Sequence, residues 1–235
     1  MTAAPDRLEE TEMTEPTTSE RLELADWRRR ISDLYSAVRA EAEDDPEAAW
    51  EVWREGRQDL FRKHPQSPVP AAGRRGFRAH HWPYDPRFRF EATVQPVAAA
   101  DADAMHAGTS IGGLMLALPI STGGDEAFTR IGRVTVRLPG GTRELGVYWM
   151  AGYAGGIFLP FRDVTNGAET YGAGRYLLDT AKSADLGADE AAGSLILDFN
   201  FAFHPSCAFD PRWSCPLAPP ENRLDLRIEA GERLT

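Results

Sequence analysis

A change of hydrophobic periodicity near His64 divides this sequence into two unlike parts. Before it, apolar residues recur every three or four positions, which places them on one face of a helix. After it, glycine and proline become frequent, and short runs alternate apolar with polar residues, as in strands that bury one face. The pattern predicts an α+β, mainly β protein: an antiparallel β-sandwich or partly open barrel preceded by two amphipathic helices.

The first predicted helix opens a helical segment that covers residues 21–64. Thr17 and Glu20 have the spacing of a capping box, in which each side chain bonds the other's backbone N–H at the start of a helix. Its apolar face is formed by Trp27, Ile31, Leu34 and Val38. Because such a face must be buried, we expect the segment to pack on the β-rich domain of residues 65–235 and to fold with it as one unit.

The second predicted helix has clear signals at both ends. Asp45 is an N-cap residue, and Pro46 suits the first helical position because that position has no helical partner for a backbone N–H. The helix is expected to end before Pro65, since a residue that precedes proline avoids the helical region.

A hairpin over Arg133 to Trp149 is the clearest β element. Val134, Val136 and Leu138 alternate with polar residues, Pro139-Gly140-Gly141-Thr142 supplies a turn, and Leu145, Val147 and Trp149 alternate on the return. Further strands are predicted at Phe88–Val97, Ile111–Leu118, Gly156–Phe161, Arg175–Leu178 and Leu195–Phe203. Since few helices separate these strands, antiparallel pairing is favoured over a parallel sheet.

The amino-terminal residues 1–20 are strongly acidic, with six acids and one base. They account for −5 of a net charge of −10 and carry few large apolar side chains, so we predict a disordered acidic tail.

The negative net charge of the chain, without a sustained basic stripe, argues against nucleic acid and anionic membranes as partners. No signal peptide or run of ~18 apolar residues is present, which favours a cytoplasmic location. The sequence leaves a homodimer open.

Polar side chains mark the strand predicted at Leu195–Phe203. Alternation places Leu195, Leu197, Phe199, Phe201 and Phe203 on one face and Ile196, Asp198, Asn200 and Ala202 on the other. Asp198 and Asn200 would then lie ~6–7 Å apart on one side of the sheet, at ~3.3 Å per residue. They could converge on a ligand, or they could pair with an arginine and a loop backbone.

One histidine and two cysteines follow that strand within twelve residues: His204, Cys207 and Cys215. Zinc sites usually contain cysteines separated by two to four residues, whereas seven residues separate these two, and a fourth ligand would have to be His64, His80, His81 or His106. A Cys–His nucleophilic pair is a second alternative. The simplest interpretation is two thiols, or one disulfide, that pack a proline-rich loop, so we predict no metal and no cofactor.

Several motifs together resemble the bacterial and archaeal domain-of-unknown-function family DUF1684. They are Phe158-Leu159-Pro160-Phe161-Arg162-Asp163, Thr170-Tyr171-Gly172-Ala173-Gly174-Arg175-Tyr176-Leu177, Leu197-Asp198-Phe199-Asn200 and Cys215-Pro216 to Leu224, with His64-Pro65-Gln66-Ser67-Pro68 and Tyr84-Asp85-Pro86 upstream. The resemblance spans roughly residues 50–232 and implies one folded domain, but no activity. The chain departs from the family pattern at His204, which follows the strand where the family has asparagine; this weakens His204 as a metal ligand.

Two functions remain open for the polar residues of these motifs. In the first, a small-molecule site, enzymatic or not, binds a polar or anionic ligand: Asp198 or Glu221 serves as general base, and the ligand is held by Arg162, Tyr171, Arg175, Asn200, Asn222 and Arg223. In the second, a structural or protein-interaction module, the same residues form a buried salt-bridge network. Both predict that six of these residues come together in space: Arg162, Arg175, Asp198, Asn200, Glu221 and Asn222.

Overall fold

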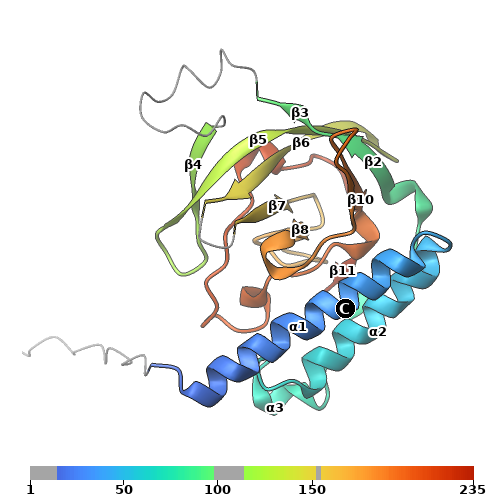
Figure 1. Cartoon of the computed structure of the whole chain (residues 1–235). Coiled ribbons are helices and arrows are strands. Elements are labelled where there is room, and N and C mark those ends of the chain that lie inside the picture. Colours follow the sequence, from blue (N-terminus) through green and yellow to red (C-terminus); the bar gives the residue numbers. More distant parts are fainter. Residues whose placement is uncertain (1–14, 98–113, 152–154) are drawn as a thin grey trace, which may run out of the picture.

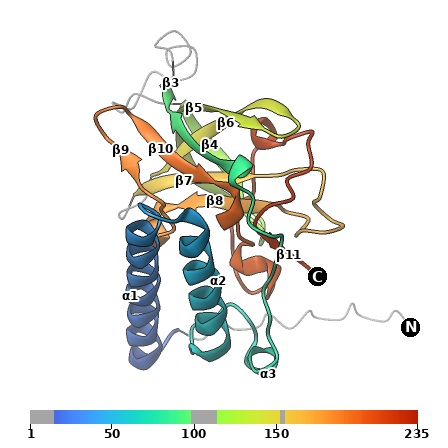
Figure 2. The same ribbon diagram turned by 90° about the vertical axis from the view of Figure 1, so that its right-hand side faces the viewer.

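Two long helices and a set of antiparallel sheets make up the computed structural model of the chain, which describes residues 15–97, 114–151 and 155–235. Helix α1 covers Thr18–Glu41 and α2 covers Pro46–Lys63; a short α3 covers Ala71–Arg74. Figures 1 and 2 show α1 and α2 side by side against one side of the β-rich part. The predicted α+β, mainly β class is confirmed. In the described part of the chain, no helix is both long and apolar enough to cross a membrane.

Both predicted helix starts are confirmed by their caps. The Thr17 hydroxyl accepts from the Glu20 N–H, and the Glu20 carboxylate accepts from the Thr17 N–H at 2.7 Å. The Asp45 carboxylate accepts from the N–H groups of Glu47 and Ala48, each at 3.0 Å. Because α1 begins at Thr18, residues 18–20 are helical and do not belong to the predicted tail; residues 1–14 lie outside the described residues.

The named strands form three sheets, and every pairing between them is antiparallel. The large sheet has the order β3-β5-β6-β7-β8, with β4 also paired to β5; its strands are β3 Gln95–Pro96, β4 Leu114–Pro119, β5 Asp125–Leu138, β6 Gly141–Met150, β7 Gly156–Phe161 and β8 Arg175–Asp179. The second sheet joins β2 Arg89–Thr93, β10 Ser194–Asp198 and β9 Ala188–Asp189, and the third pairs β1 His80–His81 with β11 Glu232–Arg233.

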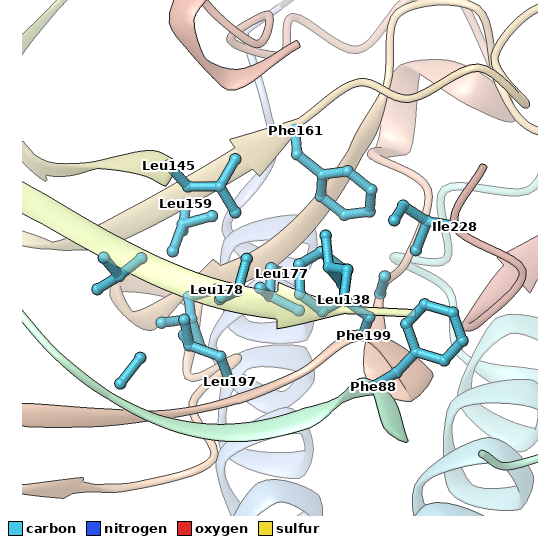
Figure 3. Close-up of a cluster of buried hydrophobic side chains, with 14 of the residues drawn as sticks. Phe88, Leu138, Leu145, Leu159, Phe161, Leu177, Leu178, Leu197, Phe199 and Ile228 are labelled. Atoms are coloured by element: carbon cyan, nitrogen blue, oxygen red, sulfur yellow. The ribbon is translucent and has the colours of Figure 1, made fainter. Parts of the chain in front are cut away.

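The predicted hairpin is the β5–β6 pair, in which Leu138 lies opposite Gly141. The strands predicted at Gly156–Phe161 and Arg175–Leu178 are present, as is the described part of the one at Ile111–Leu118, whose residues 111–113 lie outside the described residues. The single strand predicted at Phe88–Val97 is wrong, because β2 and β3 are separate strands in different sheets. Apolar side chains from the large sheet and from β2 and β10 meet in one core, which Figure 3 shows between the strands. This core has two sheets facing each other, as expected for a sandwich.

The strand predicted at Leu195–Phe203 is too long. Strand β10 ends at Asp198, and Phe199–Phe201 form a 3-10 turn, because the Asp198 carboxylate accepts the Asn200 N–H at 2.9 Å and caps that turn. The alternation of side chains between the two faces of the strand therefore ends at Asp198. Phe199 stays in the core between the sheets, whereas Phe201 packs toward the helices with its ring centroid 5.3 Å from that of Trp53.

The helices share a second core with the β-rich part. Ile31 and Val38 of α1 and Trp53 of α2 pack against Leu186 and Phe201. The Trp50 indole N–H donates to the backbone carbonyl of Asn200 at 2.9 Å. This packing places α1 and α2 over the end of β8 and the loops that follow β10.

Candidate functional site

Asp198 and Asn200 belong to a first polar network, in which their side chains bond each other, β2 and the loop before β2. The Asn200 amide group donates to the Asp198 carboxylate at 2.8 Å, and it exchanges two hydrogen bonds with the backbone of Asp85. Arg89, which faces Asp198 across the β2–β10 pair, donates to that carboxylate at 3.4 Å. Burial raises the pKa of Asp198, and the hydrogen bonds from Asn200 and Arg89 oppose this effect.

Arg175 belongs to a second network and is fully buried. Its guanidinium donates to the Asp163 carboxylate at 3.3 Å and to the backbone carbonyls of Ile228, Ala230 and Glu232. Asp163 in turn accepts the Ile228 N–H at 2.8 Å. Burial lowers the pKa of Arg175, and the charge of Asp163 opposes this. The pair holds the carboxyl-terminal segment against β7 and β8.

Glu221 and Asn222 belong to a third network on β6. Asn222 is fully buried: its side chain accepts the Gly146 N–H at 2.7 Å and donates to the carbonyls of Gly146 and Pro160. The Glu221 carboxylate accepts from the Tyr148 hydroxyl at 2.7 Å and from Arg130 at 3.2 Å. Burial and the bond to Glu221 raise the pKa of Tyr148.

The three remaining predicted residues lie beside these networks. Arg162 and Arg223 form an isolated backbone bridge; the Arg162 side chain is half-buried and Arg223 is exposed. Tyr171 is half-buried, and its N–H donates to His204 Nε2 at 3.3 Å. The single network predicted around Arg175, Asp198 and Glu221 is therefore replaced by three, because each charged group bonds a nearer partner on a neighbouring strand or loop.

The described residues form a cleft elsewhere, between helix α1 and the β-rich part. It consists of an outer cavity of about 230 Å³ and an inner cavity of about 80 Å³. The two cavities adjoin, because both are lined by Trp27, Ile31, Pro68, Lys182, Ser206 and Cys215. We call this space the α1 cleft. None of the eight predicted site residues lines it.

Asp179, at the end of β8, lines the inner cavity of the α1 cleft. The residue is 2% exposed, and its Oδ2 lies 3.0 Å from the Nζ atom of Lys182. Its Oδ1 is buried and has no hydrogen-bond partner among the residues that the structure describes. An unpaired buried carboxylate oxygen is costly, so a ligand donor that reached this atom by a small side-chain movement would be favoured.

Sequence reasoning missed the α1 cleft, although it contained one signal. Only two of the 26 basic residues are lysines, Lys63 and Lys182, and Lys182 lies at the cleft. A lone lysine in an arginine-rich chain is a weak signal, and no motif surrounds it. The cleft itself depends on where α1 packs, which periodicity does not specify.

The two cysteines lie together, as free thiols. The Cys207 N–H donates to Cys215 Sγ at 3.3 Å. His204 has other neighbours: its Nε2 accepts from Tyr171, and its Nδ1 lies 3.8 Å from Glu232. Within the described ranges no group of three His, Cys, Asp or Glu side chains could hold a metal ion; His106 lies outside those ranges.

Comparisons with known proteins give a family but no activity. No curated protein matches the chain. The solution NMR structure of an uncharacterized protein from gene locus rrnAC0354 of Haloarcula marismortui is similar, with a TM-score of 0.56 and 28% sequence identity over 83% of this chain and 97% of that one. A family model described as "Protein of unknown function (DUF1684)" matches residues 77–233, so it includes Asp179, Lys182 and both cysteines but not α1 or α2. The chain therefore belongs to the DUF1684 family.

Proposed function

We propose that this protein binds a small amphipathic organic acid in the α1 cleft. The observation that carries the proposal is that Asp179, whose buried Oδ1 has no partner among the described residues, belongs to the lining of a cavity. A ligand hydroxyl or amide N–H would satisfy that oxygen. Small-molecule sites typically combine an apolar lining with a few placed polar groups, which is the composition of this cleft.

The lining of the α1 cleft favours an apolar ligand body. Trp27 and Ile31 of α1, Phe61 of α2, and Tyr176 and Phe203 of the β-rich part surround the inner cavity. Four of these five side chains are aromatic, and aromatic walls suit a flat or branched hydrocarbon group. The cleft thus matches a ligand with a ring or a branched chain.

The charges around the outer cavity favour an acidic group on the ligand. Arg28 and Lys182 line it, and its described lining residues include no carboxylate. The Lys182 side chain is 62% exposed and can turn toward the cavity. A ligand carboxylate near these two cations, with a hydroxyl at Asp179, would extend through both cavities.

For the eight residues predicted from the motifs we propose the structural alternative. The hydrogen bonds of Asn222, Asn200 and Arg175 support it, because each of these side chains is already bonded to protein groups from neighbouring segments. Such residues hold the loops around the sheets. In this proposal Asp198 and Glu221 serve the fold and do not act as bases.

Thermal shift with three matched compounds tests the proposed ligand class. We expect 4-hydroxyphenylacetate to raise the melting temperature more than phenylacetate, which lacks the hydroxyl, or 4-methylphenol, which lacks the acid. A ligand at ~100 times its dissociation constant adds ~2.7 kcal/mol, enough for a shift of several degrees. Equal, negligible shifts with all three compounds would contradict the proposal.

Two variants test which side chains cause the preference for the ligand hydroxyl and the preference for the ligand carboxylate. Asp179→Leu should remove the advantage of the hydroxyl, and Lys182→Met should reduce the advantage of the carboxylate. Glu144→Gln, on the exposed surface of β6, is the matched control and should change neither. Without ligand, Asp179→Leu should change the melting temperature little, because it removes one buried oxygen that lacks a partner and one ion pair whose lysine is exposed.

A further inference from the structure

Cys207 and Cys215 are the only cysteines of the chain, and the fold brings their side chains into contact. Both are buried, with exposed fractions of 7% and 4%. The sulfur of Cys215 lies 3.3 Å from the backbone nitrogen of Cys207, and the two cysteine side chains interact. A disulfide requires Cβ atoms about 3.5–4.5 Å apart, and a sulfur that already contacts the backbone of the other cysteine is near that arrangement.

The backbone around each cysteine is fixed. Cys207 lies in the 3-10 turn Ser206–Ala208, and the Cys215 N–H donates to the Ser121 hydroxyl at 3.0 Å. The carbonyl of Cys215 accepts the Ser121 N–H at 2.9 Å. Because two separate segments hold the thiols at this position, their contact is a property of the fold and not of a mobile loop.

The two thiols are not equivalent. Interactions with the side chains of Cys215, Ser121 and Tyr171 lower the pKa of Cys207. The donated bond to Cys207 raises the pKa of Cys215, as does burial. This difference in pKa favours Cys207 as the attacking sulfur and Cys215 as the resolving sulfur.

The pair is reachable from the α1 cleft. Ser206 and Cys215 line both of its cavities, whereas Cys207 lines neither, so a small oxidant that enters the cleft would have to pass Cys215 to reach Cys207. Hydrogen peroxide has only one oxygen atom more than water, so it is small enough to enter the inner cavity. Larger disulfide compounds would not fit the inner cavity of about 80 Å³.

We propose that Cys207 and Cys215 form a peroxide-oxidised dithiol. The Cys207 thiolate attacks one oxygen of hydrogen peroxide; the O–O bond breaks, Cys207 becomes a sulfenic acid, and hydroxide leaves and takes up a proton. The Cys215 sulfur then attacks the Cys207 sulfur, its proton leaves with the hydroxyl as water, and the disulfide forms. Two thiols and one peroxide give one disulfide and two waters, so the peroxide takes up both electrons.

Thiol counting on the full-length chain tests this proposal. After treatment with a small excess of hydrogen peroxide, thiol titration in denaturant should fall from two per chain to none, the chain should stay monomeric on a non-reducing gel, and dithiothreitol should restore both thiols. Retention of both thiols, or a disulfide only between chains, would overturn the proposal. These measurements require no ligand, so their outcome does not depend on whether the proposed binding function is correct.

Variants assign the two roles. Cys215→Ser should stop the reaction at a Cys207 sulfenic acid, which dimedone traps, and Cys207→Ser should react with peroxide roughly tenfold or more slowly than Cys215→Ser. Tyr171→Phe keeps both cysteines and removes one donor to Cys207, so disulfide formation should slow while its end point is unchanged. If Cys207→Ser reacts as fast as Cys215→Ser, and Tyr171→Phe matches the wild type, Cys207 is not the attacking thiolate.

Discussion

Replacing Arg175 with methionine is expected to lower the free energy of unfolding by about 3–5 kcal/mol, the usual cost of removing one partner from a buried ion pair. Neither side chain of the Arg175–Asp163 pair is exposed to solvent. Methionine fills much of the same space, but it leaves the Asp163 carboxylate without a counter-charge and the Ile228 carbonyl without its donor. Urea denaturation at neutral pH measures the loss.

A double-mutant cycle separates the ion pair from general damage to the core. Arg175→Met together with Asp163→Asn should cost less than the sum of the two single changes, because the second change removes the unpaired charge. Arg133→Met, which breaks the exposed pair with Glu144, is the control and should cost less than about 1 kcal/mol. A loss of that small size for Arg175→Met would contradict the structural role of the second network.

Stability is expected to fall steeply as the pH decreases from 6.5 toward 4, because His81 and His204 are buried in their neutral form. Burial lowers the pKa of each to about 4. The unfolded chain, with ordinary histidine pKa values near 6.5, takes up protons over this range that the folded chain does not, so protonation favours unfolding. Each unit of pKa difference corresponds to ~1.4 kcal/mol, and the expected loss is several kcal/mol.

Glu232 lies between these two histidines, and its protonation at lower pH should also lower the free energy of unfolding. Burial alone would raise its pKa, but the charge and hydrogen bonds of Arg57 outweigh this and lower the pKa to about 2. Its contribution is fully present above its ordinary pKa of 4.5 and is lost as the pH falls toward 2. The stability curve should therefore decline further below pH 4.5.

Urea denaturation at pH 7.5, 5.5 and 4.5 measures this dependence. His81→Phe should flatten the curve between pH 6.5 and 4.5, because phenylalanine keeps a ring against Trp50 and Trp53 but binds no proton. His80→Gln, at an exposed neighbouring position, is the control and should leave the slope unchanged. A wild-type stability that stays constant from pH 7.5 to 4.5 would contradict the buried neutral histidines.

Local signals in the sequence predict most of the elements of this fold. The capping box of Thr17 and the Asp45-Pro46 start specify the helices because the groups that cap a helix lie within a few residues of its first turn. The β5–β6 hairpin follows from alternation and from Pro139-Gly140 for the same reason.

Features that depend on distant partners were not predictable in this way. Alternation extends the last long strand to Phe203, but the Asp198 carboxylate caps a turn and ends β10 at that residue. Once the strand ends there, Asn200 bonds Asp85 rather than continuing along the sheet face toward Glu221. The α1 cleft likewise arises where helix α1 meets the end of β8, and no sequence spacing records that contact.

The position of a bound ligand is the most direct test of the central claim, which is that the α1 cleft is the binding site and the motif residues are structural. Backbone amide shifts of the isotope-labelled protein, recorded while 4-hydroxyphenylacetate is added, locate that position. We predict shifts at Ile31, Lys182 and Ser206, with little change at Asp198 and Asn222. Shifts centred on Asp198, Asn222 and Arg223, with the cleft amides unchanged, would contradict the account.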